Sequence, residues 1–242
     1  WAAAHRVSLI PRGAGSAMGG GNVGEGVILD LTGLPTRIEI DPVSRIARTT
    51  ASVCLAELNR EAGKAGLRLP PDPASGAWAT AGGAVATNAA GARSVRYGSV
   101  RRWVQSVEMV TADGEATELR RGARGTAAAV RRFEEEAAPL IRSAADTISS
   151  RFPHTRKNSS GYALDAYLAS GDPLDLVIGS EGTLGIVTAV EWRLDPVPPC
   201  RGGLRIALAV VVDGGDEETR RSLGAIRQGR IDRIDIALPL TC

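Results

Sequence analysis

The sequence predicts a mixed fold of helices and strands arranged as one or two globular domains. Short β-branched runs separated by glycine and proline turns recur along the chain, and one long stretch of helix-forming residues lies near its middle. The length of 242 residues fits one or two domains. The 29 glycines exceed the ordinary share of about 7% and gather in a few segments. We therefore interpret the glycines as parts of a site rather than of a linker.

The first third of the chain predicts short strands and one helix. Ser52 is the expected N-cap of this helix, whose Leu55, Leu58 and Ala62 share one face. Apolar runs of four to nine residues that end at turn-forming residues predict the strands. These runs cover residues 7–10, 26–31, 37–41, 45–53 and the start of 66–76, which continues into a proline-locked loop.

The rest of the chain alternates turn-rich segments with regular elements. Residues 78–98 are rich in small residues and too irregular for a simple strand. Asp113-Gly114 between two β-like runs predicts a hairpin over 104–120. The further predicted elements are a helix over 125–152 interrupted at Pro139, a strand, glycine turn and strand over 175–194, a boundary at 197–199, a strand over 204–212, a helix over 216–228 and a strand over 231–239.

Charge and cysteine usage exclude several classes of function. The net charge of +2 gives no electrostatic footprint for nucleic acid. Cys54, Cys200 and Cys242 are odd in number and far apart, which argues against a disulfide framework, a zinc site or an iron–sulfur site and fits a reducing compartment. The two histidines, His5 and His154, form no cluster that could hold a metal. No apolar run reaches the roughly 18 residues of a membrane span, and no signal peptide is recognisable.

The densest glycine segment is "PRGAGSAMGGG", residues 11–21. A Rossmann fingerprint needs a helix after its third glycine, but a strand-like run follows here, and the lysine of a phosphate loop is missing. Successive backbone N–H groups in a tight turn can bind an anion without a helix. Residues 13–16 would supply such donors, with Arg12 and the Ser16 hydroxyl beside them. A mobile surface turn is the alternative that this segment alone leaves open.

Three further segments favour the binding site over the turn. Each is glycine-dense or proline-locked and stands next to a strand or a tightly packed small-residue stretch. A single long ligand touched by backbone at several points would require this pattern, and flavin adenine dinucleotide (FAD) has that length and a central pyrophosphate. The segments are "PPDP" at 70–73, "GG" at 82–83 with "TNAAG" at 87–91, and "GSEGTLGIVT" at 179–188.

The order of these motifs resembles the FAD-binding domain of FAD-linked oxidases, the group named after p-cresol methylhydroxylase and vanillyl-alcohol oxidase. "PRGAGS", "PPDPASGAWATAGGAVATNAAG", "YGSVRRWVQSVEMVTADGE" and "GSEGTLGIVTAVEWRLDPVP" carry the resemblance, and "RKNSSGYALDAYL" (156–168) resembles the glycolate oxidase and D-lactate dehydrogenase branch. It implies an α+β FAD-binding domain over 1–198 with two lobes, about 1–90 and about 91–198, and FAD between them. Residues 199–242 would begin an incomplete α+β cap or substrate domain.

The resemblance also implies the cofactor-binding residues. Pro11, Arg12, Gly13, Ala14, Gly15 and Ser16 would wrap the pyrophosphate; Pro71, Gly82, Gly83, Asn88 and Gly91 would line the middle and the flavin end; Gly182, Gly185, Ile186 and Val187 would close from the second lobe; Gly98 completes the set. Glu181 would fix its loop rather than touch the cofactor. Ala14 and Ala90 stand where the family often has glycine. Ser16 replaces the histidine of covalently flavinylated relatives, so we expect non-covalent FAD.

The family's reaction transfers a hydride from a hydroxyl-bearing carbon to the flavin, so we expect an FAD-dependent oxidoreductase acting on a small 2-hydroxy acid such as glycolate, D-lactate or D-2-hydroxyglutarate. We assign no residue as the catalytic base, and we expect no metal site. Candidates for the substrate or flavin edge are Arg93, Arg96, Tyr97, Lys157 and Asn158.

Two other functions stay open at this stage. One is an FAD-holding subunit of a larger redox complex with little activity alone, with a partner subunit or a fused iron–sulfur domain. The other is a flavoenzyme of the ether-lipid alkylglycerone-phosphate synthase type. The expected location is cytoplasmic, with contact to a membrane only through the unidentified electron acceptor.

Overall fold

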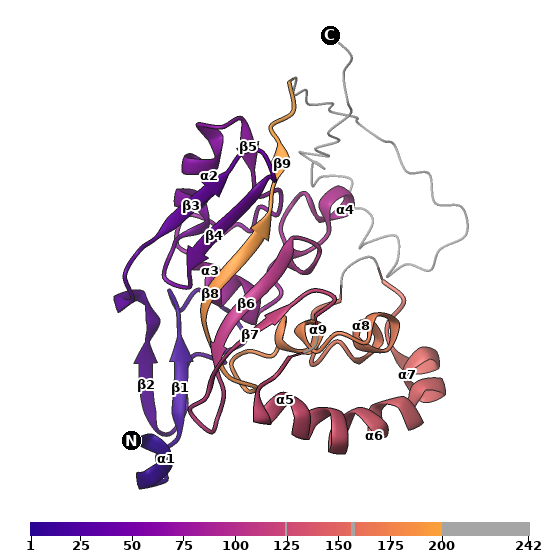
Figure 1. The fold of residues 1–242 in the computed structure, drawn as a ribbon. Coiled ribbons are helices and arrows are strands. Elements are labelled where there is room, and N and C mark those ends of the chain that lie inside the picture. Colours follow the sequence, from indigo (N-terminus) through magenta and orange to yellow (C-terminus); the bar gives the residue numbers. More distant parts are fainter. Residues whose placement is uncertain (124, 156–157, 200–242) are drawn as a thin grey trace, which may run out of the picture. The chain divides into compact units, whose positions relative to one another are not determined.

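A five-stranded antiparallel sheet is the centre of residues 1–196, which form one compact unit; residues 197–242 form a second. The computed structural model describes residues 1–123, 125–155 and 158–199. The elements predicted over 204–239 lie outside the described residues. In the first unit the sheet has the order β3-β4-β8-β6-β7 (Figure 1). Its strands are β3 (Ile38–Asp41), β4 (Ile46–Thr50), β6 (Val104–Val110), β7 (Ala116–Arg120) and β8 (Ile186–Arg193).

The central strand of this sheet is the last of the five in sequence. In β8, Val190 faces Thr49 of β4 on one side and Val107 of β6 on the other. The sheet therefore takes strands from both sides of residue 90, where the sequence predicts a boundary between two lobes. Long-range pairing of β8 with both neighbours joins these two parts of the chain.

Two smaller strand pairs lie outside the large sheet. β1 (Leu9–Arg12) and β2 (Val27–Asp30) pair in parallel, with Leu9 opposite Val27 and Arg12 opposite Asp30. Figure 1 shows this pair apart from the five strands. The 3-10 helix η1 (Leu31–Gly33) follows β2, and Asp30 caps it by accepting a hydrogen bond from the Thr32 N–H. The second pair joins β5 (Leu67–Arg68) to β9 (Asp195–Pro196).

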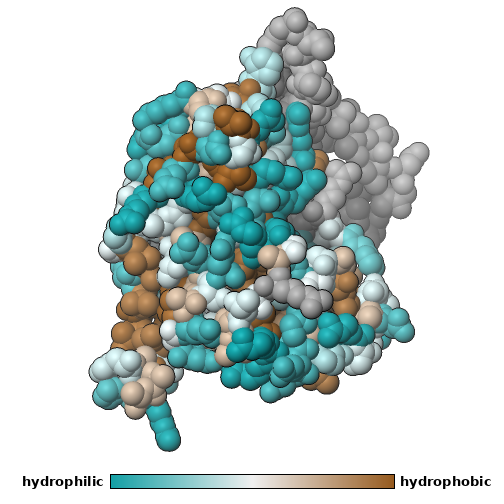
Figure 2. Space-filling view, viewed as in Figure 1, coloured by the Kyte–Doolittle hydropathy of each residue, from teal (hydrophilic) through white to brown (hydrophobic). Residues whose placement is uncertain are grey.

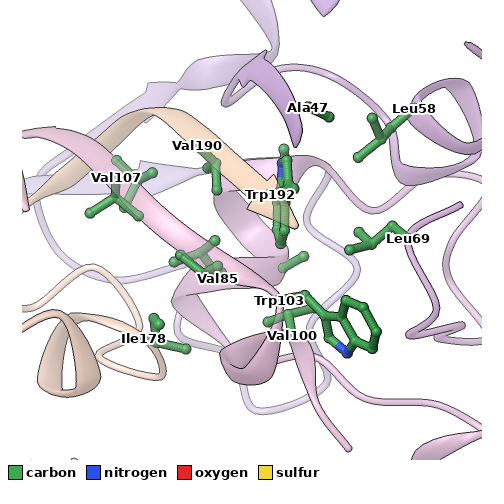
Figure 3. Packing of buried hydrophobic residues seen from close by; sticks show 14 of the residues in the cluster. Ala47, Leu58, Leu69, Val85, Val100, Trp103, Val107, Ile178, Val190 and Trp192 are labelled. Carbon is green, nitrogen blue, oxygen red and sulfur yellow. The ribbon is translucent and has the colours of Figure 1, made fainter. Parts of the chain in front are cut away.

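One buried hydrophobic cluster joins the sheet to the helices that cover it. Trp192 of β8 is fully buried, and its indole N–H donates to the Thr49 hydroxyl at 3.0 Å. Figure 3 shows Val85, Val107 and Val190 turned toward the same interior. The elements on this side are α2 (Leu55–Gly63), α3 (Ala81–Ala86), α4 (Ser94–Tyr97) and the 3-10 helix η2 (Val100–Arg102).

A row of short helices packs on a second, smaller apolar cluster. Tyr167 is buried there, and the ring of Phe133 meets it edge-on at 5.3 Å. The elements that supply this cluster are the π-helical turn η3 (Phe133–Ala137), α6 (Ala138–Ser143), α8 (Leu164–Ser170) and α9 (Leu174–Val177). The neighbouring helices are α5 (Ala128–Arg132), whose Val130 belongs to the main cluster, and α7 (Ala145–Arg151); a short α1 (Ala2–His5) opens the chain.

The predicted interruption of the long helix at Pro139 is confirmed. Proline has no N–H to continue the helical ladder, and just before it the Ala138 N–H donates to Phe133 O, five residues back. The hairpin at Asp113-Gly114 is also confirmed: it joins β6 to β7, and Gly114 has a φ of +84°.

Two predictions for local structure were wrong, and a third segment, for which no regular element was predicted, contains helices. Ser52 does not cap α2, because Cys54 is the N-cap residue and the Ser52 hydroxyl donates to Pro35 O. The strand predicted from residue 175 is helix α9. Its four residues are all buried, so no polar face marks a helical period. The irregular stretch 78–98 contains α3, whose start is set by Thr80: its hydroxyl accepts from the Gly83 N–H.

Candidate functional site

The site is a cavity of about 340 Å³ where three glycine-dense segments meet. The loop after β1, helix α3 and the loop before β8 each supply part of its wall. A volume of this size lies within the range of roughly 300–1,000 Å³ typical of ligand pockets. The described lining residues are Pro11, Gly13, Ala14, Gly15, Ser16, Ala17, Met18, Gly19, Gly21, Asn22, Leu31, Ser75, Ala79, Thr80, Gly82, Gly83, Ala84, Ala86, Thr87, Ala89, Ser159, Ser180, Glu181, Gly182, Gly185 and Val187.

The first wall is the loop that leaves β1. Gly15 has a φ of +69°, a left-handed conformation that glycine adopts without strain. The amide of Asn22 folds back and donates to Gly15 O at 3.4 Å. Gly13 lies so close to the Thr80 hydroxyl that a Cβ at this position would overlap it. This part of the main chain is therefore held against the start of α3.

The second wall is α3, which begins at the cavity. A Cβ on Gly82 would come within 2.7 Å of the Ala51 side chain, so the helix packs directly on the end of β4. The Thr87 hydroxyl donates to Gly83 O at 2.9 Å. Small side chains on this helix leave its backbone open to the cavity.

The third wall is the loop 179–185 that leads into β8. Its main chain is tied to the end of α3, because the Gly179 N–H donates to Val85 O at 3.0 Å and the Glu181 N–H donates to Ala86 O at 2.9 Å. Gly182, with a φ of +83°, comes against the ring of Pro11, and a Cβ there would overlap it. The first and third segments therefore touch across the site.

Charge at the site is sparse. Among the described lining residues Glu181 is the one carboxylate, and none is arginine, lysine, histidine or cysteine. Arg12 lies beside the first loop, with its Nε 3.3 Å from where a Cβ on Gly15 would stand. It faces Asp30 in the β1–β2 register, and hydrogen bonds from Thr32 lower the pKa of that carboxyl, with a small contribution from Arg12. The cavity can hold a ligand through backbone donors, and Glu181 is the one acidic side chain in its described wall.

The structure brings predicted cofactor residues from three of the four segments together, whereas no residue of the 70–73 segment is part of the described wall. Those that line the cavity are Pro11, Gly13, Ala14, Gly15, Ser16, Gly82, Gly83, Gly182, Gly185 and Val187. The others, Arg12, Pro71, Asn88, Gly91, Gly98 and Ile186, are not part of its wall.

Several residues outside the wall have a visible packing role. A Cβ on Gly91 would overlap the main chain at Asp72. Asn88 is buried with a φ of +46°, and its side-chain oxygen accepts a weak hydrogen bond from the Arg101 N–H at 3.4 Å. Gly98 ends α4 with a φ of +69°. Their assignment to the cofactor stays a prediction.

Of the five predicted substrate residues, the four that the structure describes do not line this cavity. Arg93 pairs with Asp72 at 3.3 Å. Tyr97 is buried, and its hydroxyl accepts from the buried Arg68 at 2.6 Å. Asn158 accepts from the Ser160 N–H, Arg96 stacks on the Tyr97 ring, and Lys157 lies outside the described residues. Their substrate role stays a prediction.

Sequence reasoning missed lining residues that carry polar groups. Asn22, Thr80 and Thr87 face the cavity, and Ser159 and Ser180 join them. Thr80 is the one that a signal could have found, because a threonine three residues before a glycine N–H is a helix N-cap pattern. The small residues around it concealed that helix.

The fit of FAD to this site can be tested on the packing. Gly13 and Gly182 are the points where a side chain would overlap Thr80 and Pro11, so main chain rather than side chains forms the inner surface there. An elongated ligand with a pyrophosphate needs such backbone donors, because no cationic side chain lines the described wall. The residues present fit FAD.

Comparison with known proteins defines the class. Residues 1–120 match the FAD binding domain family. Through this domain the chain belongs to the FAD-linked oxidase family, and FAD is its cofactor.

Individual proteins similar to this chain have names that specify a substrate. A D-lactate dehydrogenase of Anaerostipes hadrus is 34% identical over 196 residues, covering 80% of this chain and 32% of the relative. A D-2-hydroxyglutarate dehydrogenase of Xanthomonas citri pv. viticola is 34% identical over 203 residues, covering 82% and 34%. Glycolate oxidase subunit GlcD of Bacillus subtilis is 30% identical over 196 residues, covering 80% and 33%. The chain thus spans about a third of these relatives.

A solved alkyldihydroxyacetonephosphate synthase shares the fold. The TM-score is 0.55 at 23% identity, over 82% of this chain and 31% of the synthase. This likeness supports the mixed helix and strand architecture of an FAD-binding domain. Over the described residues, no group of histidine, cysteine or acidic side chains could hold a metal ion, and no helix has the length and apolarity to cross a membrane.

Proposed function

We propose that this chain is the FAD-holding part of an oxidoreductase that oxidises a small 2-hydroxy acid such as glycolate, D-lactate or D-2-hydroxyglutarate. The observation that carries the proposal is the meeting of three glycine segments around one cavity. The names of three relatives support the substrate class. Because the chain spans about a third of them, the activity is proposed for the longer protein.

The residues of this chain would bind and orient the cofactor. Backbone N–H groups of residues 13–16 would face the pyrophosphate, with Arg12 adding positive charge nearby. The small residues of α3 and the loop 179–185 would enclose the middle of the molecule and its flavin end. We assign the FAD-binding domain to residues 1–198, and the start of a substrate domain to 199–242.

When bound, FAD supplies the hydride acceptor for oxidation of a CH–OH group. A 2-hydroxy acid also needs a cation for its carboxylate and a base for its hydroxyl proton. The described cavity wall contains no cation for the carboxylate, and we expect its one carboxylate, Glu181, to fix the loop 179–185 rather than to act as the base. Arg93, Arg96, Tyr97, Lys157 and Asn158 remain the candidates within this chain, and no base is assigned.

Because residue 16 is serine rather than histidine, it has no imidazole that could form a covalent bond to the flavin. The bound FAD is therefore non-covalent in this proposal. Acid precipitation of the loaded protein should release the yellow colour into the supernatant. Colour that stays with the denatured pellet would contradict non-covalent attachment.

The test of function begins with titration of FAD into the purified chain, followed by flavin fluorescence. Saturable quenching is expected. The longer protein that contains this chain, loaded with FAD, is then mixed anaerobically with glycolate, D-lactate or D-2-hydroxyglutarate, with L-lactate as the stereochemical control. Bleaching of the visible flavin band by one of the first three supports the proposal, and failure to bind FAD contradicts it.

The absence of a cationic side chain and of an assigned base in the described cavity wall favours one alternative, an FAD-holding subunit with little activity alone. FAD binding without bleaching by any of the acids would support this subunit role. A redox-neutral exchange of an acyl for an alkyl group would instead indicate an ether-lipid synthase. A cytoplasmic location and an electron acceptor provided by a partner subunit or a fused iron–sulfur domain are parts of the same proposal.

A further inference from the structure

Arg101 is a buried cation placed between two of the glycine segments. It lies in η2, and 17% of its side chain is exposed. Its guanidinium donates to the main-chain oxygens of Asp175 and Ile178 and to Asp175 Oδ1 at 3.0 Å. Its own N–H donates to Asn88 Oδ1. One residue therefore contacts Asn88 of the 87–91 segment and Ile178, the residue that precedes the loop 179–185.

Asp175 is the hub of this arrangement. Its carboxylate is 5% exposed and also accepts from Arg121 Nη1 at 2.8 Å and from the Ser170 hydroxyl at 2.8 Å. Arg121 pairs with Asp172 and Asp175, and its guanidinium also donates to the main-chain oxygens of Val104 and Arg101 rather than to Ile178. The two arginines share one carboxylate, but only Arg101 reaches the chain that enters the cavity loop.

The contact with Ile178 lies one residue from that loop. Gly179 follows with a φ of +98°, and a Cβ there would stand 3.4 Å from Asn88 Cβ and 3.6 Å from Arg101 Nη2. The next contact along the chain is the hydrogen bond that the Gly179 N–H donates to Val85 O. Arg101 thus contacts the loop at its root, where α3, Asn88 and Ile178 converge.

We propose that Arg101 is a positioning residue for FAD, which fixes the root of the loop 179–185 against α3 so that the cavity is shaped before the cofactor arrives. This rests on the FAD site proposed above. Its two-pronged guanidinium is needed because it serves a carboxylate and a main-chain oxygen together. Lysine has a single ammonium and cannot reproduce that geometry.

The test measures FAD affinity and stability separately on the full 242-residue chain. R101M and R101K are compared with R121M. This matched control removes the other arginine that pairs with Asp175. Each protein is titrated with FAD by flavin fluorescence, and the FAD-free protein is unfolded in urea. We expect the Kd for FAD to rise about tenfold in R101M and severalfold in R101K, but less than twofold in R121M, although both methionine variants lose stability.

Hydrogen exchange on the unaltered FAD-free chain gives a measurement that needs no variant. The amides of Gly179 and Glu181 should exchange as slowly as those of β6, and FAD should add little protection. Fast exchange that FAD suppresses would overturn the proposal, as would equal affinity losses in R101M and R121M that follow their losses of stability. A failure of the unaltered chain to bind FAD would refute the proposed site instead, while slow exchange at Gly179 and Glu181 would still report the anchored loop.

Discussion

The five-stranded sheet and the β1–β2 pair differ in what holds them in place. The inward residues of β6 and β8, such as Val107 and Trp192, are fully buried in one hydrophobic cluster. In the β1–β2 pair, Val27 and Ile28 remain exposed at 44% and 41%, and Figure 2 shows hydrophobic surface over this pair. The sheet gains its stability from burial, whereas the pair depends on its ladder and on contacts with α3 and the loop before β8. The β1–β2 pair, which leads into the loop proposed to bind the pyrophosphate, therefore gains less stability from burial of its own side chains than the sheet does.

The largest effect should follow from emptying the sheet core. Trp192→Ala removes a fully buried ring and its hydrogen bond to Thr49, so the free energy of unfolding should fall by about 3–5 kcal/mol. Ile28→Ala on β2 is the control and should cost less than about 1 kcal/mol. Urea unfolding followed by tryptophan fluorescence for Ile28→Ala, and by circular dichroism for both, measures the difference. If both variants lost a similar amount of unfolding free energy, burial would not distinguish the five-stranded sheet from the β1–β2 pair.

A smaller effect on stability but a large one on binding is expected at Gly15. A β-branched residue at a φ of +69° is strained by about 1–3 kcal/mol, and its Cβ would press on Arg12 and Asn22. Gly15→Val should therefore fail to bind FAD at concentrations that saturate the unaltered chain, while the sheet still unfolds cooperatively. Gly33→Val is the control, because nothing lies within 4 Å of a Cβ there. Full flavin occupancy in Gly15→Val would show that the loop is not the pyrophosphate site.

The smallest effect is the acid sensitivity of the sheet. Hydrogen bonds from Arg120 lower the pKa of Glu191 and outweigh the opposing effect of its burial, with Arg48 also contributing. A carboxyl whose pKa is lowered on folding adds stability above its unfolded pKa of about 4.3, and this is lost as the pH falls through the folded value. Glu191→Gln should cost about 1–2 kcal/mol at pH 7, and the cost should shrink progressively as the pH falls below about 4.3 and through the lowered pKa of the folded protein. Glu118→Gln, which removes an exposed partner of Arg120, should cost less than about 0.5 kcal/mol at either pH.

The contrast between the regions also explains what the sequence could predict. Strands bounded by glycine, proline or Asp-Gly turns were placed within a few residues, because these turns are local signals. Helix α9 was missed because all four of its residues are buried and no period is visible. The place of β8 between β4 and β6 could not be predicted, since Thr49 and Val190 are far apart in the chain and nothing local encodes their pairing.

The candidate site was predictable for a similar reason. Gly13, Gly15 and Gly182 stand where the main chain must turn or come close to a neighbour, so glycine density marked their segments, and the family resemblance then assigned these residues to the cofactor. Arg101 was visible only as one of four arginines in a basic stretch at 93–102, and its burial between Asp175 and Ile178 depends on tertiary packing. Gly91 was assigned to the cofactor, but the close neighbour that the structure shows is the main chain at Asp72.

The position of β8 in the sheet has a consequence for synthesis. The ribosome produces β3, β4, β6 and β7 before the strand that joins them, so β4 and β6 each present an open edge until residue 193 has emerged. Such long-range pairings form slowly, and unpaired edges invite association with other chains. Because the loop 179–185 runs directly into β8, the same late event that closes these edges also completes the cavity wall. A nascent chain would thus acquire its mature core and its capacity to hold a cofactor in one step.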